Sequence, residues 1–317
     1  MSRNISIVIN ESEITAGTRG ASLGPGAIQV AARNRNNDMF GRFPVHTIET
    51  ENHLLDTDVK YRSGKRIDGL VKIYERVSAV VKNIRKKNDF ALVIAGDHGS
   101  AGGTIAGLKM ANPNKRIGVL WIDAHGDMHT PYTTPTGNMH GMPLATALNE
   151  DNLECRINDV SEDTAAMWEK LKNTGGIAPK ISPEDLAFIA LRDTEEPEDL
   201  YMERVGIKNY TVAELREKST QKVLAELDAK FAACDEVYIS FDVDSMDPAE
   251  TSHGTGTPVD NGLHPKEAEE ILLHFAAQEK VSCIEFVEVN PCLDEKTNKM
   301  AEVAFDFIEK VVNVVSK

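Results

Sequence analysis

The sequence predicts an α/β protein with a mostly parallel sheet that helices cover on both faces. Short runs rich in Val and Ile recur along the chain, and most are continuous, which is typical of strands buried on both faces. Helical patterns lie between these runs, and such alternation indicates parallel strand pairing. With 317 residues and 41% apolar content, the chain is expected to form one large domain over residues 1–317.

The expected elements follow the chain in order. Strands are predicted at ISIVI (5–9), PVHTIE (44–49), FALVIAG (90–96), IGVLWIDA (117–124), LAFIAL (186–191), EVYISFDVD (236–244) and VSCIEFVEV (281–289). Helices are predicted over residues 68–86, 265–278 and 297–315. In the first helix Leu70, Ile73 and Val77 recur at helical spacing, and Pro265 opens the second.

Two segments are expected to lie outside this core pattern. The polar segment 148–184 is predicted to be a helical excursion on the surface. The Gly-rich segment 16–27 lacks both the GKS/T ending of a P-loop and the GxGxxG spacing. We therefore interpret it as a turn-rich loop that leads into a helix.

The composition argues against several classes of protein. A net charge of −15 and a pI near 5.1 are the opposite of the basic face of a nucleic-acid binder. An acidic surface could attract a cationic substrate, although many soluble proteins are simply acidic. The sequence shows neither signal-peptide features nor an apolar run of the roughly 18 residues that a membrane span needs. The four cysteines are scattered, so we expect reduced thiols and a cytoplasmic location.

Acidic and imidazole side chains follow three of the predicted strands. Asp123, His125 and Asp127 alternate at the end of one strand, and they share a face if strand geometry persists to Asp127. A second strand ends in Asp242 and Asp244. A third predicted strand is followed by His98. Since the carboxyl ends of parallel strands form the ligand crevice, we expect all six side chains at one edge.

Four carboxylates packed so closely would repel one another, and cations would resolve that conflict. Each motif alone is more often a helix cap or a surface turn, but three together predict a site for two divalent ions. Mixed oxygen and imidazole ligands suit manganese, with zinc, cobalt, nickel or iron as alternatives. Such a pair lowers the pKa of a bridging water and creates a nucleophile.

Two further residues are candidates for chemistry. His140 lies in the loop TPYTTPTGNMHGMP and could relay protons, because imidazole titrates near neutrality; the alternative is a surface histidine. Glu288 ends an apolar run and could pair with a cationic substrate group, in bidentate fashion if that group is a guanidinium; the alternative is a cap for the next turn.

The chain resembles the ureohydrolases, the arginase and agmatinase superfamily, in six sequence blocks. The matching blocks lie in the family's order: AGDHGSAGGT (95–104), WIDAHGDMHTP (121–131), GNMHGMP (137–143), SFDVDSMDP (240–248), GTGTPV (254–259) and EVNP (288–291). The resemblance implies a three-layer α/β/α sandwich with a mostly parallel, roughly eight-stranded sheet and two Mn²⁺ per chain. It implies the metal ligands His98, Asp123, His125, Asp127, Asp242 and Asp244.

The resemblance also implies roles in the substrate site. The family's proton-shuttling histidine falls on His140, its guanidinium-contacting glutamate on Glu288 and its nearby threonine on Thr257. The loop TTPTGNMHGMP looks most like that of arginases, which hold the substrate's α-carboxylate and α-amino group there. In this chain that loop provides Thr134, Thr136 and Asn138.

Three departures from the arginase pattern concern the substrate. Arginases have Asn where this chain has His129. Their segment GLRDVDPGE is ALRDTEEPED here, so the family's amino-group-binding aspartate maps to Glu196, with Glu195 as a rival, and the glutamate three residues on maps to Asp199. The segment SHGTGTP carries one extra residue near His253.

The resemblance therefore predicts an arginase. A hydroxide bridging two manganese ions would attack the guanidinium carbon of L-arginine, and the metals and Asp127 would stabilise the transition state, giving L-ornithine and urea. One alternative is a ureohydrolase for agmatine, guanidinobutyrate or formimidoylglutamate. Another is a non-catalytic, metal-binding family member. The resemblance also implies a homo-oligomer, a trimer or a hexamer.

Overall fold

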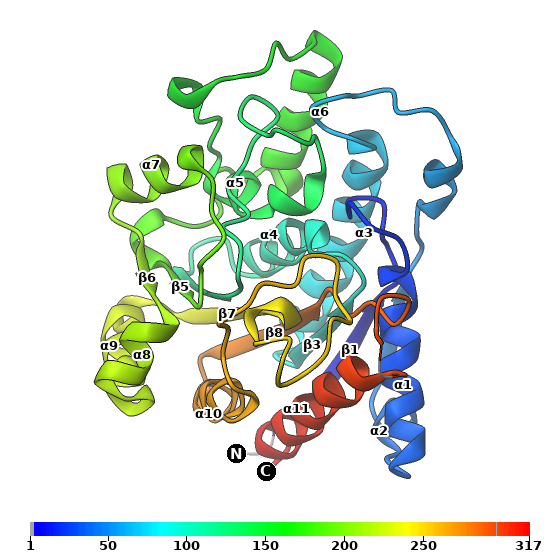
Figure 1. Ribbon diagram of the computed structural model, residues 1–317, viewed down its shortest axis with the longest axis vertical. Helices are drawn as coiled ribbons and strands as arrows, with labels where there is room; N and C mark the ends of the chain where they lie inside the picture. The colour runs from blue at the N-terminus through cyan, green and yellow to red at the C-terminus, as the bar shows by residue number, and fades with distance from the viewer. Residues whose placement is uncertain (1–2, 296) are drawn as a thin grey trace.

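A single eight-stranded sheet forms the centre of the computed structural model, which describes residues 3–295 and 297–317 (Figure 1). Every strand pairs parallel to its neighbours, in the order β2-β1-β3-β8-β7-β4-β5-β6. The strands are β1 (Ile5–Asn10), β2 (Val45–Ile48), β3 (Phe90–Ala95), β4 (Ile117–Ile122), β5 (Leu186–Ile189), β6 (Lys208–Tyr210), β7 (Glu236–Asp242) and β8 (Val281–Val287). The predicted α/β class and parallel sheet are confirmed.

Helices cover both faces of this sheet because alternate strand residues face opposite sides. In β3, Leu92 and Ile94 pack into one hydrophobic core, whereas Val93 packs into the other. Helices with buried residues in the first core are α1 (Gly24–Asn34), α8 (Val212–Lys218), α9 (Thr220–Lys230), α10 (Pro265–Ala276) and α11 (Lys299–Val315). Those in the second are α3 (Ile67–Lys86), α4 (Ala101–Ala111), α5 (Pro143–Leu148), α6 (Glu162–Lys172) and α7 (Glu196–Val205). The short helix α2 (Met39–Arg42) follows α1, and its Met39 also belongs to the first core.

Most predicted elements are found, with two differences. The strand β6 has three residues, of which only Tyr210 is buried, so its sequence carries no apolar run. The segment 148–184 is more than a surface excursion, because Trp168 of α6 is completely buried in the second core. Within the described residues 3–295 and 297–317, no helix is long and apolar enough to cross a membrane.

The strand order decides where functional residues can meet. The strands β3, β8, β7 and β4 are direct neighbours in the middle of the sheet. They come from distant parts of the chain, yet their carboxyl ends open at the same edge. Loops that follow these four strands therefore face one another across a short distance.

The packing of α11 on the sheet can be tested at Phe305, whose ring is completely buried in the first core. Replacing it with alanine removes contacts and leaves a cavity, so Phe305→Ala should lower the free energy of unfolding by about 3–5 kcal/mol. Denaturant unfolding measures this loss. The control Leu23→Ala changes a side chain that is 56% exposed and should alter it by less than about 0.5 kcal/mol. An equal effect of both variants would contradict this packing.

Candidate active site

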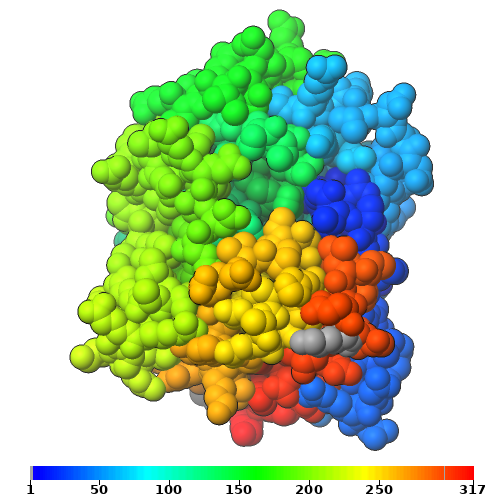
Figure 2. Space-filling model, in the orientation of Figure 1, coloured from blue at the N-terminus to red at the C-terminus, as the bar shows by residue number. Residues whose placement is uncertain are grey.

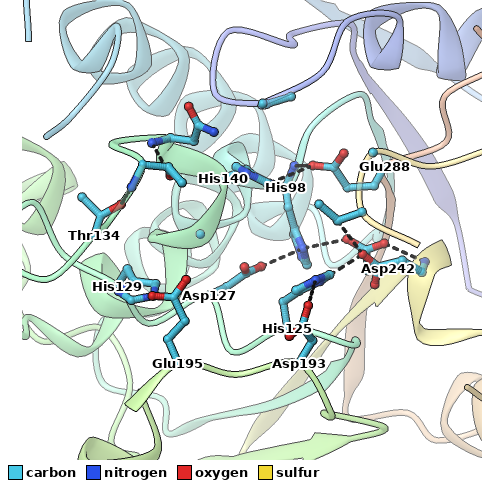
Figure 3. Close-up of a pocket in the computed structure, with 18 of the residues that line it drawn as sticks. His98, His125, Asp127, His129, Thr134, His140, Asp193, Glu195, Asp242 and Glu288 are labelled. Atoms are coloured by element: carbon cyan, nitrogen blue, oxygen red, sulfur yellow. Dashed lines mark hydrogen bonds and ion pairs between the residues drawn. The ribbon is translucent and has the colours of Figure 1, made fainter. Parts of the chain in front are cut away.

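Three aspartates surround one imidazole at the carboxyl edge of the central strands, and Figure 3 shows two of them, Asp127 and Asp242, beside His98. His98 follows β3, and its Nδ1 lies 3.1 Å from Asp123 Oδ2, 3.0 Å from Asp127 Oδ2 and 3.2 Å from Asp242 Oδ2. All four residues are buried. The three carboxylate oxygens and the ring nitrogen thus lie as close together as ligand atoms around a cation are expected to lie.

A second group of ligands adjoins the first and shares Asp123 with it. His125 Nδ1 lies 3.0 Å from Asp244 Oδ2 and 3.4 Å from Asp123 Oδ1. The two groups His98–Asp123–Asp127 and Asp123–His125–Asp244 each bring their ligand atoms within 4.8 Å of one another. A carboxylate that belongs to both groups suits a pair of metal ions held side by side.

The predicted ligands converge, but strand alternation is not the reason. The strand β4 ends at Ile122, one residue before Asp123, so the predicted strand geometry does not persist to Asp127. Asp127 instead has a left-handed backbone, with φ of 50°. Asp242 is the last residue of β7, and Asp244 lies in the 3-10 turn Val243–Ser245 that follows it. The loops after the strands therefore orient Asp123, Asp127 and Asp244, whereas Asp242 is oriented by its strand.

Charge and burial conflict in this site when no cation is bound. Burial and the neighbouring Asp123 raise the pKa of Asp127 to about 7. Burial, together with Asp244 and Asp123, raises the pKa of Asp242 well above its usual value. Burial opposes protonation of His98, but the surrounding carboxylates of Asp123, Asp127 and Asp242 raise its pKa well above the ordinary value. The protein alone can relieve this crowding only by taking up protons.

The residues fit a pair of divalent cations. His98 Nδ1 and Asp123 Oδ2 are buried, yet neither has a hydrogen-bond partner of acceptable geometry in the part of the chain that the structure describes. Oxygen and imidazole donors without thiolates suit Mn²⁺ and related ions. Cations would give these atoms a partner and offset the four carboxylates, so the predicted ligand set is consistent with this geometry.

Residues next to the ligands fix their orientation. Ser240, two positions before Asp242 in β7, places its Oγ 2.6 Å from His98 Nε2, so Nδ1 is left to face the carboxylates. The indole of Trp121 stacks on the imidazole of His98 at 4.3 Å. The sequence analysis missed both residues, although the period of two in strands would have placed Ser240 on the same face as Asp242.

A half-buried arginine, Arg192, connects the loops around Asp244. The Arg192 guanidinium donates to the backbone carbonyls of Asp244, at 2.8 Å, and Val259, at 2.7 Å. It also donates to the carbonyls of Ala190, Ser245 and Asp260. A guanidinium group has five N–H donors. This one side chain can therefore hydrogen-bond to the end of β5, the turn after β7 and the loop beyond Thr257.

The ligands form the floor of a cavity of about 290 Å³. In the view of Figure 2 the surface is hollowed where the dark-blue N-terminal segment meets the green middle of the chain and the yellow segment near residue 255. Its lining includes seven of the residues predicted for substrate binding or catalysis beyond the metal ligands: His129, Thr134, Thr136, Asn138, His140, Thr257 and Glu288. The residues Ala16, Gly17 and Thr18 of the Gly-rich loop line it too.

Two predicted catalytic residues lie beside the metal ligands. His140 Nδ1 is 3.8 Å from Glu288 Oε1, and burial lowers the pKa of His140 to about 4. Glu288 has a left-handed backbone, with φ of 66°, and its Oε1 accepts a hydrogen bond from the backbone N–H of His98 at 2.8 Å. Burial, followed by repulsion from Asp97, raises the pKa of Glu288 to about 8. Thr257 Oγ1 donates to Asp244 Oδ2 at 3.0 Å.

The far end of the cavity carries a histidine between two glutamates (Figure 3). His129 Nε2 lies 3.3 Å from Glu195 Oε2 and 3.7 Å from Glu198 Oε2, and its Nδ1 is 3.1 Å from Thr133 Oγ1. Glu195 and Glu198 both line the cavity.

This geometry corrects the placement of the two acidic positions. Glu196 and Asp199 are exposed and do not line the cavity. The reason is a capping box at the start of α7, in which Glu195 is the N-cap and Glu198 the third helical residue. The helix therefore turns Glu195 and Glu198 inward, and Glu196 and Asp199 outward.

Comparison with known proteins places the chain in one family. The model of the arginase family matches residues 4–313. The chain is 35% identical over 323 residues to the arginase of Brevibacillus brevis, with 98% of each protein covered. It is 33% identical over 319 residues to the arginase of Bacillus subtilis strain 168, again with 98% of each covered.

Solved structures agree with the sequence comparison. The 1.7 Å crystal structure of the arginase from Bacillus subtilis superposes with a TM-score of 0.83 at 32% identity, covering 99% of each chain. The predicted resemblance and the expectation of an arginase-like hydrolase are confirmed. The chain belongs to the arginase family.

Proposed function

We propose that this protein hydrolyses the guanidinium group of L-arginine to L-ornithine and urea, with two Mn²⁺ ions held by His98, His125 and the four aspartates. One observation carries the proposal. The paired ligand groups lie beside His140 and Glu288, all of these residues except Asp123 line one cavity, and a second polar cluster lies at its far end. Arginine has a guanidinium at one end and charged α-groups at the other, so its two ends match the two ends of the cavity. The similarity to bacterial arginases supports this substrate.

Divalent ions bound by His98, His125 and the four aspartates would lower the pKa of a coordinated water and so supply the nucleophile for the guanidinium carbon. The protein orients the substrate for that attack. The Oε1 atom of Glu288 accepts a hydrogen bond from the backbone N–H of His98. Its Oε2 atom lies toward Gly256 on the cavity wall, where it can accept hydrogen bonds from the guanidinium N–H groups. Asp127 lines the same wall and can stabilise the substrate's N–H groups as the carbon becomes tetrahedral.

His140 is the residue placed to move a proton to the leaving amine. Its backbone N–H donates to the Thr15 carbonyl at 3.4 Å, and its imidazole lines the cavity beside Glu288. Burial keeps the imidazole neutral near pH 7, so it can take up a proton released during attack and pass it on.

The polar cluster at the far end would hold the α-groups. Thr134, Thr136 and Asn138 form a compact loop, in which Thr134 Oγ1 accepts from the backbone of Gly137 at 2.9 Å and Thr136 Oγ1 from that of Asn138 at 3.1 Å. This loop would bind the α-carboxylate. The carboxylates of Glu195 and Glu198 would bind the α-amino group.

A second substrate class has one observation in its favour. His129 lies between Glu195 and Glu198, which leaves this end of the cavity rich in carboxylates. Such an end could accept the primary amine of agmatine, which has no carboxylate to repel. Guanidinobutyrate and formimidoylglutamate lack the amine and fit this end less well. A homo-oligomer remains a prediction from the resemblance.

Urea release is the direct test of the proposal. We expect manganese-loaded protein to release urea from L-arginine and metal-stripped protein to release at least 10²-fold less, because the nucleophile is lost with the metal. Agmatine assayed in parallel identifies the alternative substrate. Loaded protein that retains two metals per chain but releases urea from neither guanidine would contradict the proposal and favour the non-catalytic reading.

The role of His140 can be separated from metal binding. His140→Asn should lower kcat for L-arginine by about 10²–10⁴-fold, because proton transfer to the leaving amine is lost. Its manganese content, measured by elemental analysis, should stay at the wild-type value. The matched control is His253→Asn, which changes an exposed imidazole paired with Glu295 and should leave kcat within twofold. A His140 variant with nearly wild-type kcat would exclude the proposed relay.

The stability of the metal-free protein should fall as pH rises from 6.5 to 8.5. In the folded protein the pKa of Asp127 is about 7 and that of Glu288 about 8, whereas both are roughly 4 in the unfolded chain. The folded state therefore binds protons more tightly at these two carboxyls. The stability that this provides is present in acid and is lost as the pH rises through 7 and 8. Thermal melts at pH 6.5, 7.5 and 8.5 measure this slope. Manganese should raise Tm most at pH 8.5, since bound ligands are deprotonated.

The double variant Asp127→Asn, Glu288→Gln provides the control for that slope. Without the two titrating carboxyls, the metal-free melts should depend less steeply on pH. A metal-free wild type that becomes more stable between pH 6.5 and 8.5 would show that these carboxyls are ionised in the folded protein.

A further inference from the structure

A lysine lies directly behind the loop that forms one wall of the cavity. Lys65 Nζ donates to Asn138 Oδ1 at 3.0 Å, and the backbone N–H of Lys65 donates to the Gly137 carbonyl at 2.8 Å. The contact is close, since a Cβ on Gly137 would come within 1.9 Å of the Arg62 carbonyl oxygen. Gly137 also has a positive φ of 76°, which suits glycine. The segment 62–65 and the loop 134–138 therefore pack as one unit.

The chemistry of Lys65 fixes which way the Asn138 amide faces. An ammonium group only donates hydrogen bonds, so the amide oxygen must be the atom that faces Lys65. The amide Nδ2 then points the other way, toward Gly17, where a Cβ would come within 2.9 Å of it. Gly17 and Asn138 both line the cavity. Lys65 thus turns the donor side of the amide toward the cavity.

The charges around the cavity give Lys65 a second effect. Among the described residues that line the cavity, none is a lysine or an arginine, whereas Asp193, Glu195 and Glu198 stand on the wall near α7. A carboxylate entering this space would be repelled by those side chains. Lys65 is half-buried, and its ammonium lies behind Asn138. Its positive charge opposes the negative potential of these carboxylates at the loop 134–138.

We propose that Lys65 determines specificity by positioning Asn138 and by adding positive charge behind the loop 134–138, so that the cavity prefers a guanidine that carries a carboxylate over one that lacks it. The inference rests on the proposed function, because it concerns which guanidine that site accepts. Lys65 acts through Asn138 and is a positioning residue, so its loss should change substrate binding and leave the chemical step intact.

Steady-state kinetics of the manganese-loaded enzyme test this role. Lys65→Met should raise KM for L-arginine about tenfold, the effect of one lost charge-assisted interaction, while kcat stays within twofold. Agmatine, assayed as a competitor of L-arginine so that it reports binding without turnover, should keep its inhibition constant within twofold. Lys65→Arg, which restores a cation and a donor, should return KM to within about threefold of wild type.

The matched control is Lys60→Met, which removes an exposed ammonium five residues before Lys65. The Nζ of Lys60 donates to the Tyr61 hydroxyl and not to the cavity loop. It should leave both constants unchanged. An active enzyme in which Lys65→Met leaves KM for L-arginine unchanged, or weakens L-arginine and agmatine equally, would overturn the inference alone. A wild-type enzyme that releases no urea from L-arginine would instead overturn the proposed function, and the inference with it.

Discussion

Repulsion among four buried aspartates is the constraint on which the rest of this structure depends. Asp123, Asp127, Asp242 and Asp244 converge around two imidazoles at one edge of the sheet, where burial removes the water that would screen them. Without cations, burial and the neighbouring carboxylates raise the pKa of Asp127 and of Asp242, so these two carboxyl groups hold protons more readily than they would in water. Only a rigid frame can keep such groups together, and the central strands β3, β8, β7 and β4 provide it.

The loops after these strands orient the carboxylates, and two loop residues adopt an unfavourable backbone conformation to do so. Asp127 and Glu288 both have a left-handed backbone, which is uncommon outside glycine. Hydrogen bonds hold each in place: the Asp127 carbonyl accepts from the backbone of Leu144, and the Glu288 N–H donates to the Gly96 carbonyl. In both cases the unusual backbone turns a carboxylate into the cavity. Strain at these positions therefore coincides with the site where the chemistry is proposed.

The two ends of the cavity are supported differently. At the metal end, Ser240 and Arg192 act from behind the ligands, one on a ring nitrogen and the other on backbone carbonyls. At the far end, a loop held by its own threonines faces carboxylates presented by the capping box of α7. The metal end resembles that expected of the family, whereas His129 stands where arginases are expected to have Asn. Differences in substrate preference should therefore arise at the far end.

The sequence by itself determined the α/β class, seven of the eight strands and the six metal-ligand candidates, because buried runs and clustered Asp and His residues are local signals. It could not reveal β6, whose three residues bury only Tyr210, or the inward turn of Glu195 and Glu198 in place of Glu196 and Asp199. It also could not show that loops rather than strand alternation aim Asp127, or that Lys65 lies behind Asn138. These features depend on contacts between segments far apart in the chain, which only the strand order and the packing of loops bring together.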